Sequence, residues 1–181
     1  MALVAAPRAS HVYPGSLTGE AAMFQKIVEI KGEVLLMYFV DREKIEEILI
    51  YMEKQLDLFQ SQEEWNSRVE QLALERIAHT LIESILDTGN AMIDGFIMRD
   101  PGSYEDIIDI LLDEKVITKE MELSLKNVIG FRKMVVQEYT QIDHEAVVKS
   151  LKDNMDSLRL FPVHVREYLT NELGPVSAFR N

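Results

Sequence analysis

The sequence predicts an all-α protein, an antiparallel bundle of four to five helices. Apolar residues recur at steps of three and four from residue 41 almost to the end of the chain, the spacing of one helix face. Capping residues and Pro-Gly breakers divide this pattern into segments with short connections. No run alternates with period two for long enough to predict a strand. Short connections between helices place neighbours antiparallel.

The first two helices are predicted from two apolar stripes. The first helix spans about residues 41 to 60, and its stripe consists of Ile45, Ile48, Leu49, Met52, Leu56 and Phe59. The second helix is much longer and ends near the breaker at residues 99–102 (RDPG). Its stripe consists of Trp65, Val69, Leu72, Ile77, Leu81, Ile85 and Met92.

The later helices are predicted from their capping residues. Ser103 with Asp106 three residues on indicates a short third helix over 104–113. Thr118 opens a fourth, which we expect to run on into residues 130–139 (GFRKMVVQEY). Its inward residues are Leu123, Leu125, Val128 and Ile129. Asp143 caps a fifth, which continues past Pro162 toward Tyr168. Its inward residues are Val147, Val148, Leu151, Met155 and Leu158.

Length and composition limit the class of protein. The 181 residues, 47% hydrophobic and 28% charged, are enough for one well-buried domain and few for two. The absence of Cys excludes a disulfide framework and thiolate metal sites, and it fits a reducing cytosol. No apolar run approaches the roughly 20 residues needed to cross a bilayer. We therefore expect a cytoplasmic protein without a membrane segment.

The beginning of the chain differs from the rest. Residues 1–36 mix Pro, Gly, Ser and Ala without a helical period, and they are predicted to be coil. We interpret them as a disordered or non-native leader and Met37 as the biological start. The predicted organisation is thus a leader over 1–36, a helical domain over 37–170 and a tail over 171–181.

Charge is unevenly distributed along the chain. The net formal charge is −12, and residues 37–125 alone hold 21 acidic and 8 basic side chains. Residues 126–166 hold seven basic and five acidic side chains. A net acidic protein is a poor general binder of nucleic acid, because neutralised phosphates supply most of that affinity. Any contact with RNA is therefore expected in the second of these segments, unless its Lys and Arg side chains only form a solvated helix face.

A polar stripe interrupts the second helix around Gly89. Glycine inside a helix costs about 1 kcal/mol relative to alanine, so we expect another helix to approach closely there. Asp87, Asn90 and Asp94 recur at helical spacing, and we interpret them as cleft-lining residues that face the fourth helix. The alternative is a helix crossing with solvent-facing polar residues.

The sequence indicates no metal site. The four histidines, His11, His79, His144 and His164, include no pair at three- or four-residue spacing, and there is no Cys. His79 precedes the polar stripe by two turns, and we interpret it as a partly buried helix residue rather than a ligand.

Arg132, Gln137 and Tyr139 interrupt the apolar pattern of residues 130–139. In a straight helix Arg132 and Tyr139 point the same way within about 20°, whereas Gln137 lies about 140° from Arg132. The three side chains therefore converge only if the helix frays near Glu138 or if two copies of the chain share one pocket.

Four segments, in order, resemble one family. Residues 131–139 (FRKMVVQEY) resemble the signature of HEPN-domain ribonuclease toxins of the HepT type, in which Arg, four residues, His, one residue and Tyr close the penultimate helix. Residues 82–90 (IESILDTGN), 103–106 (SYED) and 141–144 (QIDH) resemble that family's second helix, third-helix start and the turn after the motif. The resemblance covers about residues 38 to 170.

This resemblance implies a homodimeric HEPN bundle with active sites where the two motif helices meet. The family cuts RNA without a metal ion, so no cofactor is expected. Arg132 would stabilise phosphate charge, and the residue at position 137 would occupy the place of the proton-exchanging His. The implied partner is a minimal nucleotidyltransferase antitoxin, which silences the toxin by adding AMP to the motif Tyr, here Tyr139.

The chain departs from the family at Gln137, which stands at the motif His position. A Gln amide donates and accepts hydrogen bonds but does not titrate near pH 7, and loss of a positioned acid or base costs about 10²- to 10⁴-fold in rate. Three interpretations stay open: a HepT-like toxin, active or weakened; a catalytically inactive HEPN dimer that binds RNA, nucleotide or protein; and a bundle without a site.

Overall fold

The computed structural model describes residues 26–30, 33–37 and 40–173. It divides into two units, Met1–Met37 and Tyr38–Asn181. The coil expected for the first 25 residues lies outside the described residues. The leader and domain boundaries stay predictions.

The first unit contains a strand pair, so the expectation of a chain without strands is wrong there. Strands β1 (Lys26–Ile30) and β2 (Glu33–Met37) pair antiparallel, with Val28 opposite Leu35. The sequence of β1 has three β-branched residues in five, which favour extended backbone. Each strand has only five residues, which is too short for a period-two pattern to be recognised in the sequence.

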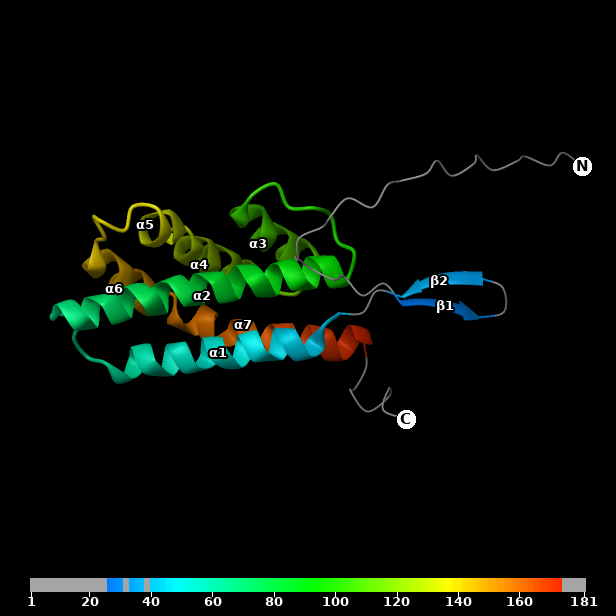
Figure 1. The fold of residues 1–181 in the computed structure, drawn as a ribbon, viewed down its shortest axis with the longest axis horizontal. Coiled ribbons are helices and arrows are strands. Elements are labelled where there is room, and N and C mark those ends of the chain that lie inside the picture. Colours follow the sequence, from blue (N-terminus) through cyan, green and yellow to red (C-terminus); the bar gives the residue numbers. More distant parts are fainter. Residues whose placement is uncertain (1–25, 31–32, 38–39, 174–181) are drawn as a thin grey trace, which may run out of the picture. The chain divides into compact units, whose positions relative to one another are not determined.

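The described part of the second unit is a bundle of seven α-helices, in agreement with the predicted fold class. Helix α2 is its centre: it contacts α1 on one side and α3, α4, α5 and α6 on the other, while α7 packs against α1 and α4 (Figure 1). The bounds are α1 Arg42–Ser61, α2 Arg68–Gly95, α3 Tyr104–Asp113, α4 Lys119–Ile129, α5 Arg132–Val136, α6 His144–Asp153 and α7 Met155–Leu173.

The predicted caps are confirmed. The side chains of Ser103, Thr118 and Asp143 accept hydrogen bonds from backbone N–H groups three residues on, at 3.1, 3.4 and 2.9 Å. Each side chain satisfies an N–H group that has no partner within the helix. Helix α2 begins with a full capping box between Ser67 and Glu70. These caps explain why the helix starts could be read from the sequence.

Two predicted helices are each divided in two. Helix α4 ends at Ile129 with Gly130 as its C-cap, and α5 begins anew at Arg132, so a continuous helix through this stretch is wrong. Glycine disfavours continuation because it loses the most backbone entropy on ordering. The predicted fifth helix breaks at Asn154 into α6 and α7, and Pro162 lies inside α7.

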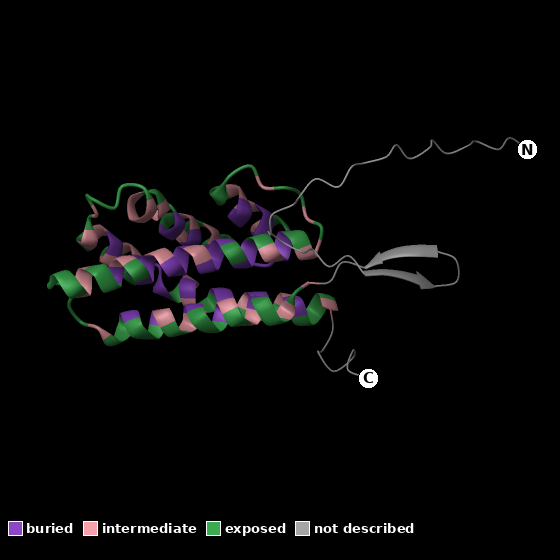
Figure 2. Cartoon of the chain, in the orientation of Figure 1, coloured by how far each residue is buried: buried purple, intermediate pink, exposed green. Residues whose placement is uncertain are grey.

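The core lies between α2 and its neighbours, whereas the outer helix faces are exposed (Figure 2). Three residues assigned to inward stripes are exposed instead: Val69, Leu72 and Leu123. Leu123 lies about 200° around the helix from the buried Met121 and Leu125, which explains its exposure. None of the helices within residues 40–173 combines the length and apolarity that a bilayer crossing requires.

Two contacts between helices stabilise the bundle, one between α2 and α3 and one between α1 and α7. At Gly89 a Cβ atom would overlap the Ile107 side chain of α3, which confirms the expected close approach of another helix. On the other side of the bundle, Arg166 of α7 binds Glu46 and Glu53 of α1 at 2.8 and 2.6 Å.

Candidate functional site

Arg132, the first residue of α5, is held by two other helices. Its Nε donates to Glu83 Oε1 of α2 at 2.9 Å, and Nη2 lies 3.5 Å from Oε2. Its guanidinium carbon lies 4.4 Å from the centre of the Tyr104 ring, at the start of α3. The side chain is 21% exposed, so the guanidinium is fixed in direction while part of it still meets solvent.

Arg132 and Gln137 line one cavity of about 360 Å³. Helix α5 ends at Val136, and Gln137 is its C-cap, with its backbone N–H still bonded to Lys133 O at 2.9 Å. Arg132 and Gln137 nevertheless line the same cavity, although an ideal helix would separate their directions by about 140°. The full lining is Ser103, Tyr104, Glu105, Ile129, Gly130, Arg132, Lys133 and Gln137.

Tyr139 is not among the residues that line this cavity. It lies in the turn after α5, and 65% of its surface is exposed. The neighbouring Lys133 and Glu138 form an ion pair at 2.6 Å, and the Glu138 carboxylate raises the pKa of Lys133. Within one chain the phenol is thus separate from Arg132 and Gln137, and it is open to a large partner.

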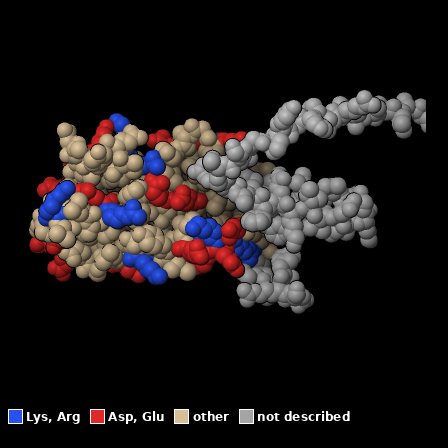
Figure 3. Space-filling model, in the orientation of Figure 1, with Lys and Arg blue, Asp and Glu red and all other residues tan. Residues whose placement is uncertain are grey.

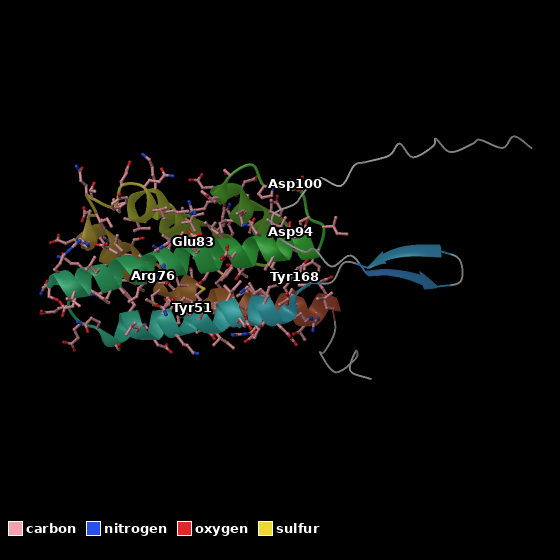
Figure 4. All side chains as sticks on the ribbon, viewed as in Figure 1. Tyr51, Arg76, Glu83, Asp94, Asp100 and Tyr168 are labelled. Atoms are coloured by element: carbon pink, nitrogen blue, oxygen red, sulfur yellow. The ribbon has the colours of Figure 1, made fainter. Side chains whose placement is uncertain are left out.

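The polar stripe of α2 lies partly in a second cavity, of about 300 Å³, between α1 and α2. Asp87 lines it together with Lys44, Glu47 and Tyr51 of α1, so the expectation that Asp87 faces the fourth helix is wrong. Burial, followed by the charge of Glu83, raises the pKa of Asp87. Asn90 and Asp94 are exposed farther along α2, where Figure 4 labels Asp94.

Glu83 links the two cavities. It lines the α1–α2 cavity, where Figure 4 shows it on α2 with Arg76, across from Tyr51 of α1. Its Oε1 accepts from Arg132 and also lies 3.7 Å from Nε2 of His79, one turn earlier. Arg76 Nη1 in turn lies 3.5 Å from His79 Nδ1.

The contacts of Glu83 with Arg132 and His79, and of Tyr104 with Arg132, were not predicted from the sequence. A signal for Glu83 and His79 was present, because residues 79, 83 and 87 are four apart and extend the polar stripe toward the start of α2. The contact of Tyr104 with Arg132 depends on tertiary packing and cannot be predicted from the spacing of residues in the sequence.

Other titratable groups lie elsewhere. His144 at the start of α6 is 2.8 Å from Glu75 of α2, two turns before Glu83. Among the described residues, no group of three or more His, Cys, Asp or Glu is arranged to hold a metal ion. On the face in Figure 3, acidic and basic side chains alternate rather than forming a basic surface.

A family model and one curated relative match most of the chain. The model is described as ribonuclease HepT-like and matches residues 42–165. The relative, YutE of Bacillus subtilis (strain 168), is provisionally named an RNase. It is 56% identical over 144 residues, which are 80% of this chain and all of the relative.

Two solved structures are similar as well. One is YutE from Bacillus subtilis, described as a cytosolic protein of unknown function, with 57% identity and a TM-score of 0.76 over 79% of this chain and 100% of that chain. The other is a tri-AMPylated Shewanella oneidensis HEPN toxin in complex with MNT antitoxin, with 16% identity and a TM-score of 0.61 over 68% of this chain and 96% of that chain. At that identity the second likeness shows the fold.

Proposed function

Because the chain belongs to the HepT-like ribonuclease family, we propose that it is the toxin component of a toxin–antitoxin pair. Its target is RNA, which it cleaves slowly and without a metal ion, at the cavity that Arg132 and Gln137 share. The observation that carries this proposal is the fixed guanidinium of Arg132 at the wall of that cavity.

Arg132 is the phosphate-binding group. A planar guanidinium offers several donors in one plane, a geometry that matches phosphate oxygens. Glu83 uses the Nε edge, and the Tyr104 ring covers one face. These contacts restrict the orientation before RNA arrives, which lowers the entropy that binding must overcome.

Gln137 is the reason for slow cleavage. Its amide can hydrogen-bond the substrate from the same cavity, but it cannot exchange a proton near pH 7. A positioned acid or base contributes about 10²- to 10⁴-fold. The same substitution favours a second candidate function, a HEPN dimer that binds RNA, nucleotide or protein at this cavity and cleaves nothing.

The proposed partners are a second copy of the chain and a minimal nucleotidyltransferase antitoxin. The antitoxin adds AMP to Tyr139, whose high exposure supports access by an enzyme. The homodimer brings two motif segments together, as the family resemblance implies. We also propose a cytosolic location, as described for the YutE relative.

RNA cleavage in the presence of EDTA tests the proposed activity. The purified chain should cleave a single-stranded RNA slowly, Arg132→Ala should abolish cleavage and weaken binding, and Gln137→His should raise the rate at least tenfold. Fast cleavage by the unaltered chain would contradict the role given to Gln137. Binding that does not depend on Arg132 would contradict the site itself.

Mass spectrometry after incubation with ATP and a nucleotidyltransferase encoded beside the gene tests the modification. The unaltered chain should gain AMP mass, and Tyr139→Phe should not. Tyr51→Phe is the matched control, because Tyr51 is also an exposed tyrosine of this domain. Equal labelling of the unaltered chain and Tyr139→Phe would refute Tyr139 as the acceptor.

A further inference from the structure

A half-exposed aromatic side chain lies in the wall of the cavity that Arg132 and Gln137 share. Tyr104 is the first residue of α3, and 50% of its surface is exposed. It lines the same cavity of about 360 Å³ as Arg132 and Gln137. A single exposed aromatic residue is common on protein surfaces, but this one lies beside the group to which phosphate binding is assigned.

The two faces of the Tyr104 ring have different surroundings. The guanidinium carbon of Arg132 lies 4.4 Å from the ring centre, over one face. Neither of the two aromatic ring pairs within the described residues includes Tyr104. Because the guanidinium covers one face, we assign the exposed surface of the ring to the other face and the ring edge.

The start of α3 holds the backbone of Tyr104 in place. The side chain of Ser103 accepts a hydrogen bond from the backbone N–H of Asp106 at 3.1 Å. The Asp106 carboxylate in turn accepts from Gly102 N at 2.8 Å and from Arg99 Nη1 at 2.7 Å. These contacts bind the chain on both sides of Tyr104. A binding residue whose backbone is ordered before RNA arrives loses less entropy on binding.

Arg132 and Tyr104 together offer the two kinds of group by which proteins bind single-stranded RNA, a cation for the phosphate and an aromatic face for the base. We infer that Tyr104 is a base-stacking residue: a nucleobase adjacent to the phosphate held by Arg132 packs on the ring face opposite the guanidinium. The inference rests on the proposed function and adds to it a contact with a base.

The separation of the two groups fits one nucleotide. A base in van der Waals contact, about 3.5 Å from the free face of the ring, would lie about 8 Å from the guanidinium carbon of Arg132. One ribose and its phosphate span such a separation. Stacking tolerates any sequence, because every base has a π-face. We therefore expect affinity for single-stranded RNA without a strong preference for one base at this position.

Fluorescence anisotropy with two labelled oligomers of equal length tests this inference. One is a short oligouridine, and the other is the same ribose–phosphate chain without bases, so the number of phosphates is equal. Both carry 2′-O-methyl groups, which prevent cleavage through the 2′-oxygen. At fixed salt the unaltered full-length chain should bind oligouridine about tenfold more tightly than the abasic chain, as expected for one stacked base. Equal Kd values would overturn the inference, and this comparison does not depend on the folding of any variant.

Substitutions of tyrosine separate stacking from support of Arg132. Tyr104→Leu should weaken binding of oligouridine about tenfold and leave binding of the abasic chain nearly unchanged. If Tyr104 only positions Arg132, the same substitution should weaken binding of both oligomers equally. Tyr104→Phe keeps the ring and should keep the preference for oligouridine. Tyr51→Leu is the matched control, because Tyr51 is 43% exposed but lies in the α1–α2 cavity, and its loss should change neither Kd.

Arg132→Ala distinguishes failure of this inference from failure of the proposed function. Because Arg132 is assigned to the phosphate, this variant should bind both oligomers more weakly. If it does so while Tyr104→Leu weakens binding of both oligomers equally, or of neither, the inference is wrong and the proposed function stands. If Arg132→Ala binds both oligomers as tightly as the unaltered chain, the proposed function fails.

Discussion

Replacement of Glu83 by Gln should tighten RNA binding, because the Glu83 carboxylate competes with phosphate for Arg132. A phosphate on the free edge of the guanidinium would lie about 7 Å from this carboxylate. At that distance two negative charges repel by about 0.6 kcal/mol in water and about 2.4 kcal/mol at the effective dielectric of a protein surface. Because the side chains of Glu83 and Arg132 are 31% and 21% exposed, we take an intermediate repulsion energy of about 1.4 kcal/mol. Removing this repulsion corresponds to about a tenfold change in Kd.

Fluorescence anisotropy with a labelled single-stranded RNA at fixed salt measures this change. Glu83→Gln should lower Kd about tenfold, although it weakens the contact that orients Arg132. Glu75→Gln is the matched control, because Glu75 is also a partly exposed glutamate of α2 and pairs with His144. An unchanged or higher Kd for Glu83→Gln, or an equal gain for Glu75→Gln, would refute this reasoning.

Two predictions concern stability. Gly89→Ala should lower the free energy of unfolding by about 1–3 kcal/mol, because the new methyl group overlaps Ile107. Gly102→Ala, whose Cβ would meet Asp106 Oδ2 at an ordinary contact distance of 3.6 Å, should be nearly neutral in urea unfolding. Ion pairs with two lysines hold the pKa of Glu122 at about 2, below its usual 4.5. Its stabilisation is thus complete above pH 4.5 and lost as pH falls toward 2. Glu122→Gln should therefore be less stable than the unaltered chain at pH 7, and the difference should vanish by about pH 2; a constant difference would contradict this.

The helices could be predicted because their signals are local. The start of α3 depends on Ser103 and its own next turn, and the contact at Gly89 follows from the cost of glycine within a helix. The division at Gly130 was not predicted, because a glycine next to a strongly apolar segment is compatible with a continuous helix and with a helix end.

The arrangement of the site could be predicted only in part. Arg132 and Gln137, which line one cavity, were predicted as site residues from the sequence. The ion pair between Arg132 and Glu83 was not predicted, because the two residues are 49 positions apart. Such a pair depends on the packing of α5 against α2. Asp87 was recognised from its spacing, yet its neighbours on α1 were not, because periodicity defines a helix face and not what covers it.

The most direct test of the central claim, that Arg132 binds RNA phosphate, is the NMR signal of the arginine Nε–H group during titration with a non-cleavable RNA. The signal of Arg132 should shift and saturate with the anisotropy Kd. The signal of Arg166, which is bound to Glu46 and Glu53, should remain in place. An Arg132 signal that stays unchanged at saturating RNA would contradict the account.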